Sequence, residues 1–242
     1  MKYIFQMFFC FLFSSCVLAN EIKPSPFTAL SIKNSDYALV CSHTDFCETG
    51  VKIWKLSGES VGLYAIGPGP KLAQMQLKNG KYRVVNEWDF SKVNQSNELG
   101  DEDLTFNGIE IFPALYPVSK TKNAIALITK WSAAYSGGGR IELVADFFML
   151  NSDNSYTPVV SDVPFYSQEQ IRACFTQSDY DKKTHCKDEN WSIIKIRVVD
   201  SGLDSYSWDI VTKSYNWPAF AEKSKMTVSQ VVERVNLLDK VK

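Results

Sequence analysis

The chain has 242 residues, with 26 basic and 27 acidic side chains, a formal net charge of −1 and 45% hydrophobic residues. This apolar content excludes an intrinsically disordered protein, and the near-neutral charge offers no cationic surface to attract nucleic acid or an anionic membrane. We therefore expect a globular protein that has no nucleic-acid partner.

The first nineteen residues have the pattern of a secretory signal peptide. Lys2 precedes an apolar stretch from Ile4 to Leu12, and a small-residue pattern that ends at Ala19 follows it. The apolar stretch is too short to span a bilayer. The pattern predicts cleavage after Ala19, leaving residues 20–242 as a single β-rich domain that is periplasmic or secreted and does not insert into the membrane.

A lipoprotein signal is an alternative for this leader, with Cys16 as the lipidated residue. Such a signal carries a leucine three positions before the cysteine, where this chain has the bulky Phe13. We therefore favour soluble export over a lipid anchor at Cys16.

Four cysteines follow the leader, an even number that favours two disulfides in an oxidising compartment. Three pairings are possible, and we favour the two that close small loops: Cys41 with Cys47, and Cys174 with Cys186. His43 and His185 lie beside these cysteines, so zinc binding is an alternative. The spacing matches no standard zinc motif, and we expect neither a metal nor another cofactor.

Short alternating segments between turn residues dominate the mature chain, a pattern typical of an antiparallel β protein. The clearest example is the segment Leu72–Trp88, in which Asn79-Gly80 supplies the two residues of a type I′ hairpin turn. This turn would place Leu77 opposite Tyr82 on one face, and Met75 opposite Val84 on the same face.

Further strands are indicated by the same alternation. They are expected at Tyr37–Ser42, Val51–Leu56, Val61–Ile66, Asn123–Trp131, Arg140–Leu150, Trp191–Asp200 and Ser205–Thr212. Asn123–Trp131 and Arg140–Leu150 would form a hairpin around the loop Ser132–Gly139. The second of these strands is apolar on much of both sides, which predicts a central position in the sheet.

Helix signals are few. Thr227-Val228-Ser229-Gln230 has the form of a capping box and predicts an amphipathic C-terminal helix over Thr227–Asp239, although its valines leave a strand as the alternative. A shorter helix is predicted from Ser167 to Ala173.

The expected fold class is mainly β, with antiparallel sheets in a sandwich-like or partly closed barrel arrangement and a C-terminal helix. Trp88-Asp89 and Trp208-Asp209 resemble the dipeptide that ends strands in WD-repeat propellers. A small β-propeller-like arrangement is therefore the alternative.

A glycine-rich loop at Ala133–Gly139 contains Ser136 in a setting similar to the nucleophile elbow of some α/β-hydrolase lipases. Asp146 or Asp162, and then His185, follow in the order of a catalytic triad. An elbow requires a helix after the serine, whereas a strand pattern follows here. We therefore predict a hairpin loop and assign no catalytic residue.

Polar loops provide the candidate contact residues. The stretch Glu98–Asp103 lacks the spacing of a calcium loop and is expected to be a solvated acidic loop. Together with the glycine-rich loop it gives the candidate contact residues Glu98, Asp101, Glu102, Asp103, Tyr135, Ser136 and Arg140.

These features favour a non-enzymatic exported binding protein, for example an inhibitor or an immunity-type protein. Its expected partner is another envelope or secreted protein, because the β scaffold and aromatic residues come without a recognisable catalytic set. The alternatives are an exported hydrolase whose site is assembled from distant loops, and a structural envelope protein.

Overall fold

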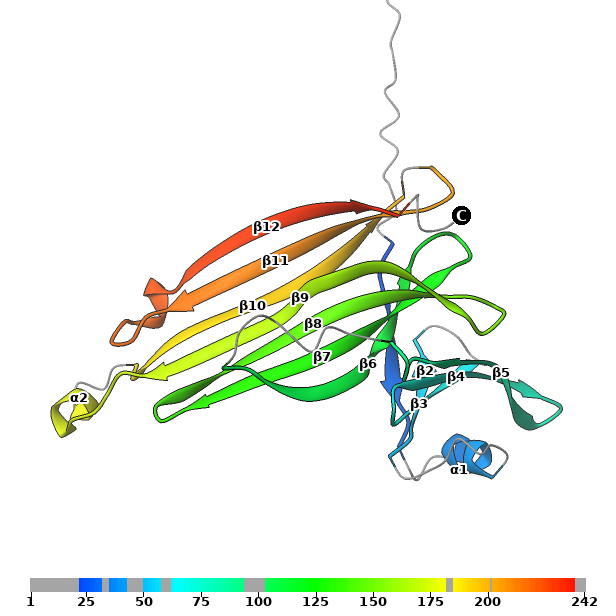
Figure 1. Ribbon diagram of the computed structural model, residues 1–242, viewed down its shortest axis with the longest axis horizontal. Helices are drawn as coiled ribbons and strands as arrows, with labels where there is room; N and C mark the ends of the chain where they lie inside the picture. The colour runs from blue at the N-terminus through cyan, green and yellow to red at the C-terminus, as the bar shows by residue number, and fades with distance from the viewer. Residues whose placement is uncertain are drawn as a thin grey trace, which may run out of the picture.

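The computed structural model describes residues 22–31, 35–42, 50–57, 62–93, 103–181, 185–200 and 202–237. In these residues the chain is mainly β, and twelve strands form one large antiparallel sheet that is not closed into a barrel (Figure 1). The strand order is β12-β11-β10-β9-β8-β7-β6-β1-β2-β3-β4-β5. None of the helices in the described residues is long and apolar enough to span a membrane.

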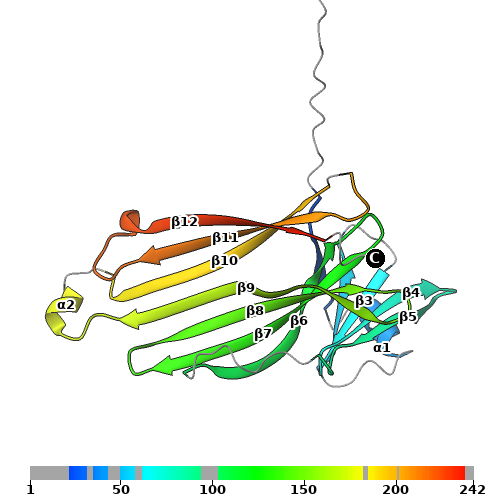
Figure 2. The same ribbon diagram turned by 45° about the horizontal axis from the view of Figure 1, so that its top comes forward.

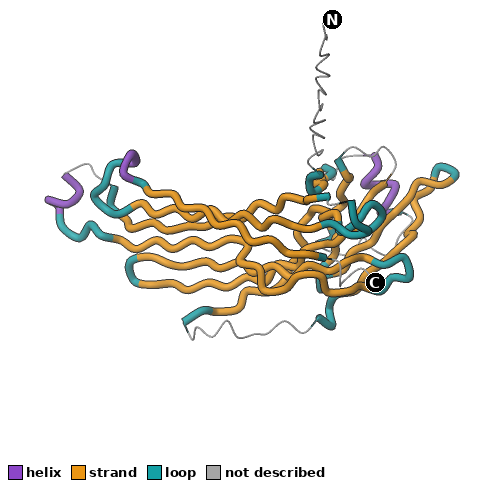
Figure 3. The backbone as a smooth tube through the Cα atoms, turned by 90° about the horizontal axis from the view of Figure 1, so that it is seen from above, coloured by secondary structure: helices purple, strands orange, loops and turns teal. Residues whose placement is uncertain are grey.

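Long neighbouring strands make up the C-terminal part of the sheet and give the molecule its elongated shape (Figures 1 and 2). They are β6 (Thr105–Pro117), β7 (Asn123–Tyr135), β8 (Gly138–Leu150), β9 (Tyr156–Arg172), β10 (Lys187–Val199), β11 (Ser207–Trp217) and β12 (Thr227–Asn236). Figure 3 shows that the helices are short and lie near the two ends of this elongated body. The strands therefore form almost all of its length.

Shorter strands form the N-terminal part of the sheet. They are β1 (Ser25–Ala29), β2 (Lys52–Leu56), β3 (Gly62–Gly67), β4 (Lys71–Lys78) and β5 (Lys81–Asp89). β1 joins the two parts, because it pairs with β6 through Ser25↔Leu115 and with β2 through Phe27↔Leu56. The helices of the described residues are α1 (Ser35–Cys41), α2 (Gln177–Asp181) and the 3-10 helix η1 (Lys223–Lys225).

The two parts of the sheet share a hydrophobic core. The cluster that contains Phe27, Trp88 and Phe90 from the N-terminal part also contains Leu127 and Phe148 from the long strands. Burial of these side chains fastens the short strands onto the long ones.

A second core lies where the long strands curve. Trp208 on β11 is fully buried, its ring contacts Phe147 edge-on at 5.2 Å, and its Nε1 donates to the carbonyl oxygen of Pro117 at 2.8 Å. The backbone N–H of Tyr206 donates to the carbonyl of Val118, also at 2.8 Å. Because β7 to β10 lie between β6 and β11 in the sheet, these contacts require strong curvature.

The sequence predicts the hairpins well. Asn79 and Gly80 adopt φ of 54° and 73°, and the pairs Leu77↔Tyr82 and Met75↔Val84 form as expected. The hairpin of β7 and β8 is also present, and β8 is a central strand between β7 and β9. Its turn is shorter than the predicted loop, because Tyr135 pairs with Gly138.

The predicted C-terminal helix is wrong, and the alternative of a strand is correct. Residues Thr227–Asn236 form β12, which pairs with β11 along its full length. The valines at 228, 231, 232 and 235 suit a strand, and pairing with β11 outweighs the capping-box signal at Thr227.

Three further predictions are wrong. Ser167 to Arg172 continue β9 instead of starting a helix, because they pair with β8 on one side and β10 on the other. Tyr37–Cys41 lies within α1 instead of a strand, and its Val40 is fully buried in a hydrophobic cluster with residues of β2 to β5. The sheet is one continuous array, so the separate blades of a propeller are absent from the described residues.

One predicted disulfide is confirmed: Cys174 and Cys186 are bonded, with their Cα atoms 5.1 Å apart, and link the end of β9 to the start of β10 around α2. Cys41 is also disulfide-bonded. Its expected partner Cys47 lies outside the described residues, as do the leader and Cys16.

Candidate functional site

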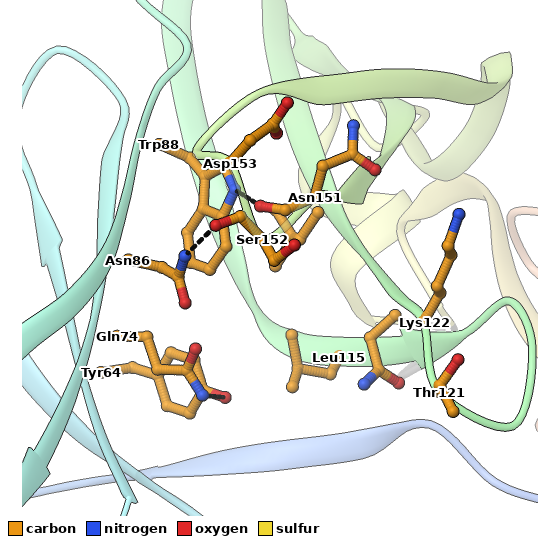
Figure 4. A pocket seen from close by; sticks show the side chains of 12 residues that line it. Tyr64, Gln74, Asn86, Trp88, Leu115, Thr121, Lys122, Asn151, Ser152 and Asp153 are labelled. Atoms are coloured by element: carbon orange, nitrogen blue, oxygen red, sulfur yellow. Dashed lines mark hydrogen bonds between the residues drawn. The ribbon is translucent and has the colours of Figure 1, made fainter.

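A cleft of about 650 Å³ lies where the short strands meet two turns of the long strands (Figure 4). Strands β3 to β5 form one wall, and the turns β6–β7 and β8–β9 form the others. The residues that line it are Tyr64, Gln74, Asn86, Trp88, Leu115, Thr121, Lys122, Asn123, Leu150, Asn151, Ser152 and Asp153.

Hydrogen bonds fix the β8–β9 turn against β5. The side-chain amide of Asn86 donates to the carbonyl oxygen of Ser152 at 3.0 Å and to Oδ1 of Asn154 at 3.1 Å. The same Oδ1 accepts the backbone N–H of Glu87 at 3.1 Å. Asn154 adopts φ of 66°, a backbone conformation that asparagine tolerates better than most residues. This wall of the cleft is thus held in place by both strand and turn.

The floor of the cleft is apolar and buried. Tyr64, Trp88 and Leu115 are 4, 3 and 5% exposed. Each ring also has a polar contact, because Trp88 Nε1 donates to the carbonyl of Asn151 at 3.1 Å and Tyr64 OH accepts from Gln74 Nε2 at 3.3 Å. The floor can therefore contact apolar groups of a ligand, while its polar atoms are already bonded.

Neutral amides and hydroxyls dominate the walls. Asn123 begins β7, and its side chain has no hydrogen-bond partner within the described part of the chain. Asn86 and Gln74 use their NH₂ groups in the bonds described above, which leaves their carbonyl oxygens to accept from a ligand. Both donors and acceptors are therefore available around one apolar floor.

Asp153 is the one carboxylate among the residues that line this cleft. Its Oδ1 accepts from the hydroxyl of Ser155 at 2.6 Å and from the backbone N–H of Ser155 at 3.0 Å, and these bonds lower the pKa of Asp153. An ionised, single carboxylate cannot serve as the paired acid and base of sugar hydrolysis.

The glycine-rich turn of β7 and β8 borders a second groove, of about 560 Å³. A Cβ atom added at Gly138 would lie 1.8 Å from the carbonyl oxygen of Gln170, so only glycine fits against β9 there. Tyr135 is 40% exposed beside this groove. Arg140 lines it and pairs with Glu142 through a 2.8 Å contact.

Among the remaining predicted contact residues, Asp103 does not line either cavity. Asp103 is exposed just before β6. Glu98, Asp101 and Glu102 lie outside the described residues. The acidic part of the predicted contact surface is thus not defined by the structure.

The considered Ser136 triad lacks support in the described structure. Ser136 lies in a tight turn between two strands, which is not the strand-to-helix geometry of a nucleophile elbow. His185 stacks on Trp217 at 3.6 Å, and its Nε2 is buried without a hydrogen-bond partner. That nitrogen therefore does not hold the Ser136 hydroxyl.

A third groove, of about 360 Å³, crosses β9 to β12. Four serines stand in register across these strands: Ser167, Ser192, Ser214 and Ser229. The stacked rings of Trp191 and Tyr215, 4.9 Å apart, contribute to its lining. Within the described residues, no group of three or more His, Cys, Asp or Glu side chains could hold a metal ion.

Sequence reasoning missed the amide-lined cleft. All four amide residues are neutral: Gln74 and Asn86 lie opposite each other on the β4–β5 hairpin, whereas Asn123 and Asn151 come from the start of β7 and from the β8–β9 turn. Neither a motif nor a charge cluster marks them, so pairing of the strands is the signal that brings them together.

No protein-family model, curated protein or solved structure shows a significant match to the chain. Function is therefore inferred from the site alone.

Proposed function

We propose that the chain is an exported, non-enzymatic binding protein whose amide-lined cleft takes a small, neutral, polyhydroxylated ligand of the saccharide class. The observation that carries this proposal is the combination of amides on the walls with buried Tyr64 and Trp88 on the floor. An amide both donates to and accepts from hydroxyl groups, and an apolar floor suits the C–H face of a sugar ring.

The charges around the cleft support a neutral ligand. Lys122 and Asp153 carry opposite charges and both line the cavity, so neither sign dominates. A charged ligand would therefore gain little over a neutral one from these two residues.

Export is supported by the disulfide between Cys174 and Cys186, which is compatible with an oxidising compartment outside the cytoplasm. The proposed ligand is consequently one that is present in the periplasm or outside the cell.

The test is calorimetric titration of the mature protein with neutral sugars, such as maltose, cellobiose and di-N-acetylchitobiose. Asn123→Ala removes an unpaired amide and should weaken binding of the sugar that binds best about tenfold, as loss of one or two hydrogen bonds predicts. The change should leave stability almost unaltered, because the amide has no partner in the described structure.

Asn216→Ala is the matched control, since Asn216 lies on β11 in the groove that crosses β9 to β12. It should leave affinity unchanged. Absence of saturable binding by any neutral sugar at millimolar concentration would contradict the proposal, as would equal affinity in the Asn123→Ala variant.

A second candidate function is protein recognition by the β7–β8 turn, in the manner of an inhibitor or an immunity-type protein. The observation that favours it is the exposed side chain of Tyr135 beside the second groove, which the glycine-rich turn of β7 and β8 borders. Tyrosine is common at protein contacts. Pull-down from the envelope fraction should then recover one stoichiometric partner, which Tyr135→Ala loses and Asn123→Ala retains.

A further inference from the structure

β12 forms one edge of the sheet and is exposed along almost its whole length. Of its ten residues, only Val235 is even partly buried, and Val228, Val231 and Val232 are 54, 67 and 47% exposed. Figures 1 and 2 show β12 at the outer side of the long strands. A long edge strand with exposed valines is a template for pairing with another strand.

The direction of the free backbone groups follows from the end of the strand. The N–H of Leu237 donates to the carbonyl of Tyr206 at 3.3 Å, and Leu237 directly follows β12. Hydrogen-bonding direction alternates along an antiparallel strand, so the odd-numbered residues of β12 bond to β11. The N–H and C=O groups that point to the open edge belong to Val228, Gln230, Val232, Arg234 and Asn236.

We propose that a second copy of this chain pairs antiparallel with β12 around a twofold axis at Val232. The two sheets then form one continuous sheet. In this register Val232 lies opposite Val232 of the second copy, Gln230 lies opposite Arg234, and Val228 lies opposite Asn236.

The strand sequence matches this self-pairing. In a twofold antiparallel ladder, the residues whose backbone N–H and C=O groups point to the open edge must lie opposite one another. Only an axis at Val232 pairs all five of these residues of β12 with their counterparts in the second copy. An axis at Glu233 or Arg234 places like charges opposite each other. An axis at Val231 places Asn236 opposite Met226, which lies before the start of β12, so Asn236 has no partner on the strand.

Side chains on the strand fit the same register. The side-chain carbonyl of Gln230 can accept a hydrogen bond from the guanidinium of the opposite Arg234, and Val232 packs against Val232 of the second copy. Arg234 keeps its intrachain bonds to Asp209, at 2.6 and 3.0 Å, because they run toward β11.

The interface is small. Pairing of one ten-residue strand falls short of the roughly 800 Å² per partner of a standard complex, so we expect a dimer that dissociates on dilution. This inference does not depend on the ligand of the cleft, which lies on the opposite edge at β5.

Sedimentation velocity of the mature protein over a range of concentrations tests the proposal. We expect the mass to double as concentration rises. Val232→Lys should keep the protein monomeric, because it places two lysines opposite each other at the axis. Val85→Lys is the matched control on β5, where Val85 is 43% exposed, and it should leave the dimer intact.

Cysteine cross-linking tests the register and does not rely on the lysine variant. Oxidised Val232→Cys should give a disulfide-linked dimer, because the two Cα atoms of such a pair lie about 5.5 Å apart. Gln230→Cys should give none, since its partner is Arg234. A protein that is monomeric at every concentration would overturn the proposal, as would a dimer that Val85→Lys disrupts and Val232→Lys does not.

Discussion

The two edges of the sheet, β5 and β12, are protected to different degrees. On β5 the turn after β8 covers part of the edge, because Asn154 accepts the backbone N–H of Glu87 and the side chain of Asn86. On β12 no covering segment is found in the described part of the chain, and the strand is exposed from Thr227 to Arg234. An edge that is covered can form one wall of a binding cleft, whereas an open edge is available to another strand.

The largest effect on stability is expected at the covered edge, from a substitution that removes the indole of Trp88. Trp88 on β5 is 3% exposed, packs in the shared core and donates to the carbonyl of Asn151. Trp88→Ala should therefore lower the free energy of unfolding by about 3–5 kcal/mol, the usual cost of deleting a buried aromatic ring. Denaturation in urea, followed by circular dichroism, measures the loss.

Val231→Ala provides the control on the open edge. Val231 is 67% exposed, so its truncation should change the unfolding free energy by less than about 0.5 kcal/mol. If the two variants lost similar stability, β5 would not be more tightly packed against the core than β12.

A smaller effect is expected from uncovering the edge without touching the core. Asn154→Gly keeps a residue that adopts positive φ easily, but it removes the oxygen that accepts from Glu87 and Asn86. The cost should be about 1–2 kcal/mol, because two hydrogen bonds are lost. Hydrogen exchange at the Glu87 amide should also become faster.

The comparison residue for this change is Asn236 on β12, whose Oδ1 accepts only from the Ser207 hydroxyl among the described residues, at 2.7 Å. Asn236→Ala should cost less than Asn154→Gly, since it leaves no backbone N–H uncovered. An unchanged exchange rate at Glu87 in the Asn154→Gly variant would show that the turn does not protect the edge.

What could be predicted from the sequence depends on whether the signal is local or comes from the pairing of distant strands. The hairpin at Asn79-Gly80 was predictable because the turn residues fix the register locally. The strand at Ser167–Arg172 was not, because its pairing with both β8 and β10 is a property of the sheet and not of the segment. β12 shows both effects, since its valines favour a strand while Thr227 begins a helix-capping pattern.

The cleft was beyond the sequence for a related reason. Asn123 and Asn86 are ordinary polar residues until β5 and the start of β7 line the same cavity. The predicted contact residues Tyr135 and Arg140 were easier to propose, because a glycine-rich loop is recognisable locally. Local signals thus identify turns, whereas sites between strands need the fold.

The smallest effect is expected from the ion pair between Arg234 on β12 and Asp209 on β11, which adds to the backbone pairing of the two strands. Arg234 donates to both carboxylate oxygens of Asp209, and this hydrogen bonding lowers the pKa of Asp209 below its ordinary 3.8. An aspartate with a lowered pKa stabilises the folded state above its unfolded pKa, and this stabilisation is lost as pH falls through the folded value. Arg234→Met should therefore destabilise the protein modestly at pH 7, and the difference from the unaltered protein should vanish in strong acid.

Arg83→Met on β5 is the control for general loss of a positive charge, because Arg83 is an exposed residue near the opposite edge. Urea denaturation at pH 7 and at pH values below 3.8 compares the two variants with the unaltered protein. Only the Arg234 variant should show a pH-dependent difference. If Arg83→Met gave the same difference, the effect would come from net charge, and the ion pair would contribute nothing specific to the attachment of the open edge.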